Sequence, residues 1–214
     1  MNENKIFQHN SYHSLRSGFY KGTIALSEAL RHGSIGIGTL DGANGEVIIL
    51  DGVAYHGDAN NQVRQVGLDD NETLPYVAVL DIKASDLNSL EFENLLSDDL
   101  YAELAKSFSN YSLYGIKITG NFRLVEIMSK PAHNTAPYEE ILEKQPHFKR
   151  EKLSGTMVGI WGPRHLESLY GSGYHLHFLS DDKSFGAHVE RFIVDSVKVE
   201  FVEIDKIEQE FDFS

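Results

Sequence analysis

The sequence predicts an α+β protein in which mixed or antiparallel β-sheets dominate and helices are few and short. Three observations predict this class. Segments with helical spacing of apolar residues are rare and brief, most other apolar segments have the length and composition of strands, and short turns join them. The sequence lacks the regular alternation of strands and helices that indicates a parallel Rossmann-type sheet.

The first half of the chain is predicted to contain two short helices followed by a β-meander. The helices are expected at residues 11–19 and 23–30, and Gly33 supplies the left-handed end of the second. Asn44-Gly45 is a strong signal for a tight hairpin turn, and Asp51-Gly52 marks a second turn. Strands are expected at residues 35–39, 46–50, 53–56 and 76–82. The polar residues 57–73 and the acidic residues 85–98 are expected to be irregular.

The second half is predicted to be a longer antiparallel run. Alternating residues 111–128 are expected to form two strand segments, with a bend or bulge at Gly120 between them. Further strands are expected at residues 153–161, 174–179, 188–194 and 197–204, short helices at 100–108 and 138–143, and at most a helical turn at 165–170.

Composition excludes several classes of function. The chain has 214 residues, 41% of them hydrophobic, so it can bury a substantial core. Its net charge of -13 argues against nucleic acid and against an anionic membrane surface as partners. Cysteine is absent, which excludes disulfides and thiol catalysis. No secretory signal and no apolar stretch of about 18 residues is visible, so a cytoplasmic location is expected.

The densest chemical signal is the segment from Tyr174 to His188. Side chains on a strand repeat with period two, so His175 and His177 face the same way, roughly 6.5–7 Å apart. The turn-rich segment between Ser180 and Gly186 allows the chain to fold back and deliver His188 to the same face. Three neutral imidazoles with an open position are typical of a catalytic zinc site. The alternative is two surface histidines and one hydrogen-bonded core histidine.

The second signal is a carboxylate at the opening of an apolar strand. Glu46 follows Asn44-Gly45 and precedes Val-Ile-Ile-Leu. A plain hairpin turn is the simpler interpretation of this segment. A buried carboxylate nevertheless needs a partner, which makes Glu46 a candidate functional residue. The seven histidines outside the first segment are scattered and are expected to be surface or hydrogen-bonding residues.

Together these segments resemble the α-acetolactate decarboxylase family. Gly36-Ile-Gly-Thr-Leu-Asp-Gly-Ala-Asn-Gly-Glu46 is similar to the family's segment around its active-site glutamate, and Gly173-Tyr-His-Leu-His-Phe178 with Asp182-Lys-Ser-Phe-Gly-Ala-His188 is similar to its metal segment. The resemblance extends from about residue 7 to residue 204. It implies two sheet-containing lobes, about residues 1–110 and 111–214, and a homodimer.

The resemblance also implies an activity. It implies a zinc enzyme that converts 2-acetolactate to acetoin, with Zn²⁺ on His175, His177 and His188 and with Glu46 as an active-site carboxylate. Loss of CO₂ leaves an enediolate, whose charge a Lewis acid stabilises. A carboxylic acid such as Glu46 can then supply the proton. No organic cofactor is needed.

The sequence departs from the family's pattern at two places. Where the family has Arg-Thr-x-Pro, this chain has Met128-Ser-Lys-Pro131, and methionine cannot bind an anion as arginine does. Weakened turnover of acetolactate is therefore expected unless Lys130 compensates. Lys130 shares a strand face with Met128 if the segment is extended, and it is taken with Glu46 as a catalytic candidate that substitutes as a point charge. The alternative is an ordinary solvated lysine. The family's carboxylate-bearing tail has no straight match before Ser214, where Glu208 and Glu210 are the nearest candidates.

Three other interpretations remain open. The first keeps the fold and the metal site but acts on another small 2-hydroxy or oxo acid, or only binds a ligand, because Met128 replaces the arginine. The second is a cupin-like barrel, although no second cupin motif is visible. The third is a non-catalytic interaction protein, for which no positive feature stands out. On the leading interpretation we expect the three histidines to meet at one point, with Glu46 aimed at it and Met128 on the wall of the same pocket.

Overall fold

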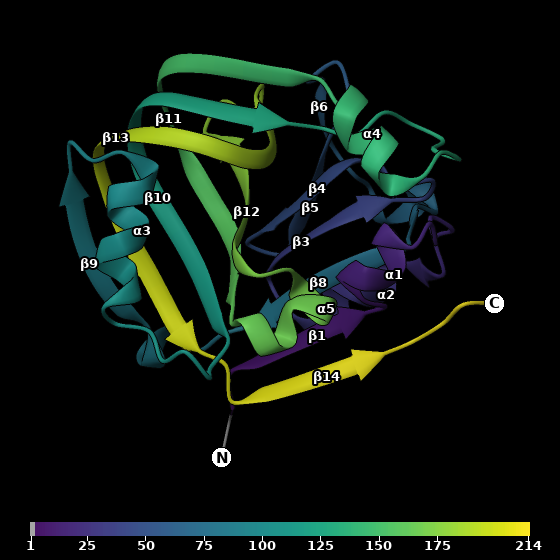
Figure 1. Ribbon diagram of the computed structural model, residues 1–214, viewed down its shortest axis with the longest axis horizontal. Helices are drawn as coiled ribbons and strands as arrows, with labels where there is room; N and C mark the ends of the chain where they lie inside the picture. The colour runs from purple at the N-terminus through teal and green to yellow at the C-terminus, as the bar shows by residue number, and fades with distance from the viewer. Residues whose placement is uncertain (1–2) are drawn as a thin grey trace.

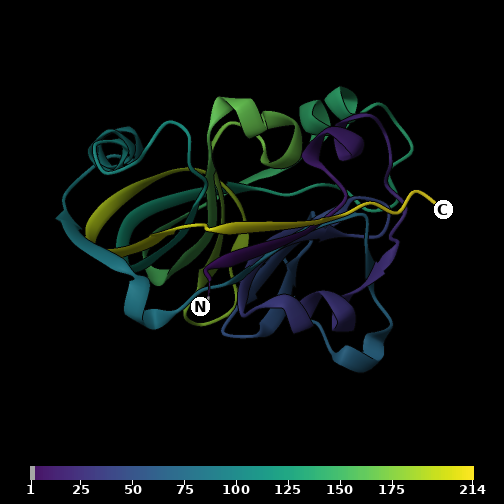
Figure 2. The same ribbon diagram turned by 90° about the horizontal axis from the view of Figure 1, so that it is seen from below.

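The structure is a computed structural model that describes residues 3–214. It is an α+β fold with about 50% strand and 19% helix, which confirms the predicted class. Two sheets lie side by side, and short helices cover parts of their outer faces (Figures 1 and 2). Among the described residues, no helix combines the length and the apolarity that crossing a membrane requires.

The larger sheet has seven strands in the order β14-β1-β8-β3-β4-β5-β6. All neighbouring pairs are antiparallel except β1 and β14, which run parallel. The strands are β1 (Lys5–His9), β3 (Ile35–Leu40), β4 (Asn44–Leu50), β5 (Val53–Gly57), β6 (Val63–Gln65), β8 (Tyr76–Asp81) and β14 (Lys206–Glu210). A separate two-stranded sheet pairs β2 (Ile24–Ala25) with β7 (Thr73–Leu74).

The smaller sheet has five strands in the order β10-β11-β12-β13-β9. The strands are β9 (Asn88–Glu93), β10 (Tyr114–Met128), β11 (His147–Gly162), β12 (Gly173–Ser180) and β13 (Gly186–Glu203). Because β10 pairs with β13 as well as with β11, the four strands β10 to β13 close on one another. Phe122, Phe178 and Phe192 pack edge to face in the core that these strands enclose.

The helices are short. They are α1 (Tyr12–Arg16), α2 (Leu26–Ala29), α3 (Ser97–Ala105), α4 (Tyr138–Lys144) and α5 (Glu167–Tyr170), with 3-10 turns at Leu30–His32, Leu68–Asp70, Ala84–Asp86 and Arg164–Leu166. The hydroxyl of Ser11 accepts from the backbone N–H of Ser14, which satisfies one of the free donors at the start of α1. With α1 fixed in this way, its first residue, Tyr12, is held in place.

A shared apolar core joins the two sheets. Ile37 and Ile48 of the larger sheet pack in one buried cluster with Val158, Ile160 and Leu179 of the smaller sheet. Strand β4 and the pair β12–β13 are thereby brought to the same junction. The division into lobes near residue 110 stays a prediction.

The structure corrects several predicted elements. Residues 88–93, expected to be irregular, form β9; most of their side chains are exposed, and their place is set by pairing with β13 rather than by an apolar pattern. The first hairpin turn lies at residues 41–43, and Asn44-Gly45 opens β4 instead. Gly42 takes the positive φ of +77° that this turn requires.

Three boundaries also differ from the sequence-based expectation. The helix expected from residue 23 begins only at Leu26, because residues 24 and 25 form β2. The segments 188–194 and 197–204 are parts of one strand, β13. Strand β10 is continuous through Gly120, and its pairing with β13 first shifts register just after it, between Asn121 and Phe122. Gly120 has φ +152°, and an added Cβ there would lie 2.3 Å from the Ser196 carbonyl oxygen.

Candidate active site and metal centre

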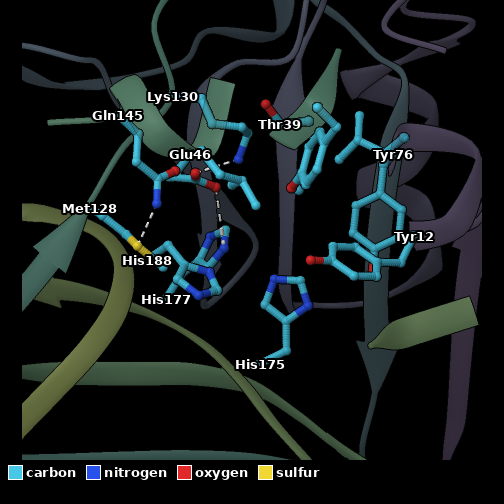
Figure 3. Close-up of a pocket in the computed structure, with 14 residues that line it drawn as sticks. Tyr12, Thr39, Glu46, Tyr76, Met128, Lys130, Gln145, His175, His177 and His188 are labelled. Carbon is cyan, nitrogen blue, oxygen red and sulfur yellow. Dashed lines mark hydrogen bonds and ion pairs between the residues drawn. The ribbon is translucent and has the colours of Figure 1, made fainter. Parts of the chain in front are cut away.

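Three histidines converge at the junction of the two sheets. His175 and His177 lie on β12, and His188 lies on β13 directly across from His177. Their ring centroids are 5.1 to 5.5 Å apart, and one nitrogen from each ring lies within 4.8 Å of the others (Figure 3). This is the convergence that the spacing predicts. The alternative of two surface histidines and one core histidine does not hold.

Backbone carbonyls orient two of these rings. The Nδ1–H of His177 donates to the carbonyl of Val47 at 2.8 Å, and that of His175 donates to the carbonyl of Tyr170 at 3.2 Å. Because a carbonyl can only accept, Nδ1 carries the proton and Nε2 keeps its lone pair. The Nε2 of His177 is buried and has no hydrogen-bond partner. Histidines that bind metals are usually held in this way, by an N–H donated to a carbonyl or carboxylate.

The three rings are held neutral. Burial lowers the pKa of His175 to about 4. Burial also holds the pKa values of His177 and His188 well below 6.5, and the neighbouring histidines lower them further. A histidine can bind a metal ion only through a ring nitrogen that carries no proton. Three neutral imidazole nitrogens around one point therefore fit a zinc ion, which prefers such donors and leaves a further position open.

Glu46 lies beside this cluster, as the sequence led us to expect. It is 3% exposed near the start of β4, with one carboxylate oxygen 3.4 Å from the Nε2 of His177 and the other paired with the ammonium of Lys130. Burial raises the pKa of the Glu46 carboxyl, and the positive charge of Lys130 partly offsets that rise. A carboxyl of this kind can carry a proton nearer neutral pH than an exposed one.

Lys130 is not solvated. It follows the end of β10 and is only 6% exposed, and its ammonium forms a buried ion pair with Glu46. Its carbonyl accepts from the backbone N–H of Gly45 at 3.1 Å, which ties this segment to the start of β4. The interpretation of Lys130 as an ordinary surface lysine is wrong.

Met128 lines the same cavity, as expected, and its partner is a residue that the sequence gave no reason to select. The side-chain amide of Gln145 donates to the sulfur of Met128. Gln145 is 8% exposed and stands just after α4, before Pro146. No motif marks it, since an isolated glutamine before a proline has no chemical signature of its own.

A small cavity connects these groups. Its volume is about 140 Å³, well below the roughly 300–1,000 Å³ typical of pockets for drug-sized ligands. Tyr12 and Tyr76 stand on the side opposite Met128 and Gln145, and the ring of Tyr76 is nearly parallel to that of His175 (Figure 3); Tyr138 also lines the cavity. These tyrosines come from three distant segments of the chain, so no local pattern in the sequence indicates that they share a cavity.

The remaining candidates lie elsewhere. Glu208 pairs with Lys206 and Lys5, Glu210 lies 3.9 Å from His9, and neither glutamate lines the cavity. Of the other seven histidines, His9 and His56 are buried and hydrogen-bonded, and within residues 3–214 none of the seven belongs to a group able to hold a metal ion.

Comparisons with known proteins identify a family. The family model for alpha-acetolactate decarboxylase matches residues 6–214. A protein of that name from Lactococcus lactis subsp. cremoris is 37% identical over 209 residues, which is 97% of this chain and 87% of the relative. Another, from Streptococcus thermophilus, is 34% identical over 210 residues with the same two shares.

Solved structures show the same similarity. A Staphylococcus aureus protein of unknown function, described as similar to alpha-acetolactate decarboxylase, superposes with a TM-score of 0.92 at 31% identity over 97% of this chain and 89% of that one. Alpha-acetolactate decarboxylase from Bacillus subtilis strain 168 also has a TM-score of 0.92, at 25% identity over 98% and 90%. The fold, the site and these relatives together show that the chain belongs to the alpha-acetolactate decarboxylase family of carboxy-lyases.

Proposed function

We propose that this protein decarboxylates 2-acetolactate to acetoin with the help of a zinc ion. The observation that carries the proposal is the single small cavity in which three neutral histidines meet a buried Glu46–Lys130 pair. The family membership supports the same reaction. A cavity of about 140 Å³ suits an acid of a few carbon atoms rather than a larger metabolite.

His175, His177 and His188 would hold the ion. Bound there, Zn²⁺ would act as a Lewis acid that stabilises negative charge developing on the oxygens of the substrate. The hydrogen bonds to Val47 and Tyr170 keep two of the imidazoles oriented with Nε2 free. Because these imidazoles are already oriented, binding of the ion costs little free energy for ordering them.

Glu46 is suited to the proton transfer. In the reaction the bond between C2 and the carboxylate carbon breaks, CO₂ leaves, and the electron pair remains on the substrate as an enediolate. Protonation of carbon then gives acetoin. Burial raises the pKa of Glu46, so its carboxylate can take up a proton from water, deliver it to the substrate carbon beside the histidines and return to the ionised form paired with Lys130. We assign Glu46 the role of proton donor.

Lys130 acts through Glu46. Its buried ammonium binds one carboxylate oxygen and leaves the other beside His177. Lys130 is therefore a positioning residue that sets the orientation of the carboxyl and limits the rise of its pKa. Since its charge is already paired, it is poorly placed to act as a free clamp for the substrate.

The experiment is direct. Zinc-loaded protein is incubated with racemic 2-acetolactate, and acetoin and CO₂ are measured together. We expect equal amounts of the two products, and loss of both in protein stripped by a chelator. If the protein forms no acetoin but turns over another small 2-hydroxy or oxo acid, the substrate assignment is wrong and the assignment of the active site stands. Absence of turnover for all such acids would overturn the proposal.

A further inference from the structure

The walls of the cavity contain no free positive charge for a carboxylate. Among the described residues that line it, Lys130 is the one lysine or arginine, and its ammonium is paired with Glu46. The hydroxyl of Thr39 is also engaged, since it donates to the carbonyl of Gly45 at 2.7 Å. The neutral donors that line the cavity are the tyrosine hydroxyls, of which that of Tyr76 is buried without a hydrogen-bond partner, and the side-chain amide of Gln145.

The side-chain amide of Gln145 is a donor that gives up only a weak hydrogen bond when it binds a carboxylate. Its amide N–H groups lie at the wall of the cavity, and the partner of one of them is the thioether sulfur of Met128. A thioether is a weak acceptor, whereas hydrogen bonds to a carboxylate are about twice as strong as those between neutral groups. Exchanging the sulfur for a carboxylate oxygen loses a weak contact and gains a strong one.

We propose that Gln145 binds the carboxylate of the substrate through its side-chain amide, with Met128 as the partner that holds this amide in place when the cavity is free. The inference rests on the proposed decarboxylation. It names the group that determines specificity for an acid over the uncharged product.

A neutral donor suits this reaction. The carboxylate is charged in the bound substrate and becomes neutral CO₂, so a fixed cation would stabilise the substrate more than the transition state. Only interactions that are stronger in the transition state accelerate the chemical step. The apolar side chain of Met128 beside the amide disfavours the charged carboxylate relative to CO₂. Gln145 thus provides recognition while Met128 keeps this end of the cavity free of charge.

The arrangement in Figure 3 supports this division of the cavity. Gln145 and Met128 stand on one side of the histidine cluster, and Tyr12 and Tyr76 stand on the other. The amide side would receive the carboxylate, and the tyrosine side, where the hydroxyl of Tyr76 has no hydrogen-bond partner, would receive the rest of the acid.

The test separates binding of the carboxylate from binding of the rest of the molecule. Gln145→Met has nearly the same volume and removes the donors. Acetoin carries the same hydroxyl and ketone as acetolactate but has no carboxylate, and it serves as the second probe. We expect KM for 2-acetolactate to rise about 10- to 100-fold, as for loss of a hydrogen bond to a charged group, with kcat changed by less than about threefold. The inhibition constant of acetoin should stay within about twofold.

Two further variants complete the design. Gln145→Glu places a second carboxylate beside that of the substrate and should raise KM at least as far. Gln65→Met, on the exposed strand β6, is the matched control and should leave both constants unchanged. An unchanged KM in Gln145→Met, or a parallel rise in the acetoin constant, would overturn the role of Gln145.

Failure of the proposed decarboxylation can be distinguished from failure of the role of Gln145. If wild-type protein forms no acetoin, the proposed function fails, and calorimetric titration with 2-acetolactate still tests the residue. Weaker binding of acetolactate to Gln145→Met than to wild type, with equal binding of acetoin, would then support Gln145. Equal binding of acetolactate to both proteins, or no binding to either, would refute it.

Discussion

Replacing Lys130 by methionine tests the buried pair at the centre of the site. Both side chains of the pair are almost fully buried, with exposures of 7% for Lys130 and 4% for Glu46. The substitution removes the ammonium, keeps most of the apolar volume, and leaves a buried carboxyl without its cation. Breaking a buried pair from one side typically costs about 3–5 kcal/mol in the free energy of unfolding.

The loss should depend on pH with a definite sign. Burial already raises the pKa of Glu46 in the folded protein, and removing Lys130 removes the charge that lowers it. The folded state then keeps a proton that the unfolded state has released, so stability falls as pH rises above the unfolded pKa of about 4.3. The slope is at most about 1.4 kcal/mol per pH unit, until the pH passes the folded pKa.

The assay is denaturant unfolding of chelator-treated protein at pH 5 and pH 8. Wild type, Lys130→Met and the double variant Lys130→Met/Glu46→Gln are compared. We expect the single variant to lose more stability relative to wild type at pH 8 than at pH 5. The double variant should recover at least about 2 kcal/mol at pH 8, because the uncompensated carboxyl is gone. A single variant less than about 1 kcal/mol below wild type at pH 8, or a double variant no more stable than the single one, would refute the reasoning.

Three further predictions address the metal and the substrate. Glu46→Gln should lower kcat by about 10²- to 10⁴-fold while one zinc ion per chain stays bound, as steady-state kinetics and metal analysis would show; near-normal turnover would remove Glu46 from proton transfer. Met128→Arg should lower KM for 2-acetolactate by about tenfold without raising kcat, since a fixed cation stabilises the bound carboxylate; a rise in kcat would show instead that a lost cationic clamp limits the reaction. Because burial lowers the pKa of His175 to about 4, dialysis from pH 7 to pH 5 should leave zinc bound, with release as the pH approaches 4; release already near pH 6.5 would contradict the neutral cluster.

The parts of the site that the sequence predicts are those set by local geometry. His175 and His177 share a face because strand side chains alternate, and a short turn is enough to bring His188 opposite them. Glu46 was identifiable because a carboxylate at the opening of an apolar strand needs a partner. The strand-rich fold class follows from the same local periodicity.

The parts that the sequence missed depend on long-range packing. Lys130 was a candidate on the same strand face as Met128, but its partner Glu46 lies 84 residues away along the chain, so the local sequence could not indicate their ion pair. Gln145 enters the cavity from the end of a short helix, and Tyr76 enters from β8. Strand β9 escaped prediction because its mostly exposed side chains show no apolar alternation. In each case pairing between distant strands decides the position.

The most direct test of the central claim is a zinc titration of metal-free protein with acetoin formation as the readout. If His175, His177 and His188 hold one catalytic ion, activity rises in proportion to bound zinc and reaches its plateau at one ion per chain, and a His188→Ala variant stays inactive over the same range. Acetoin formation that is equal in metal-free and zinc-loaded protein, or a His188→Ala variant that recovers wild-type activity at one ion per chain, would contradict the account.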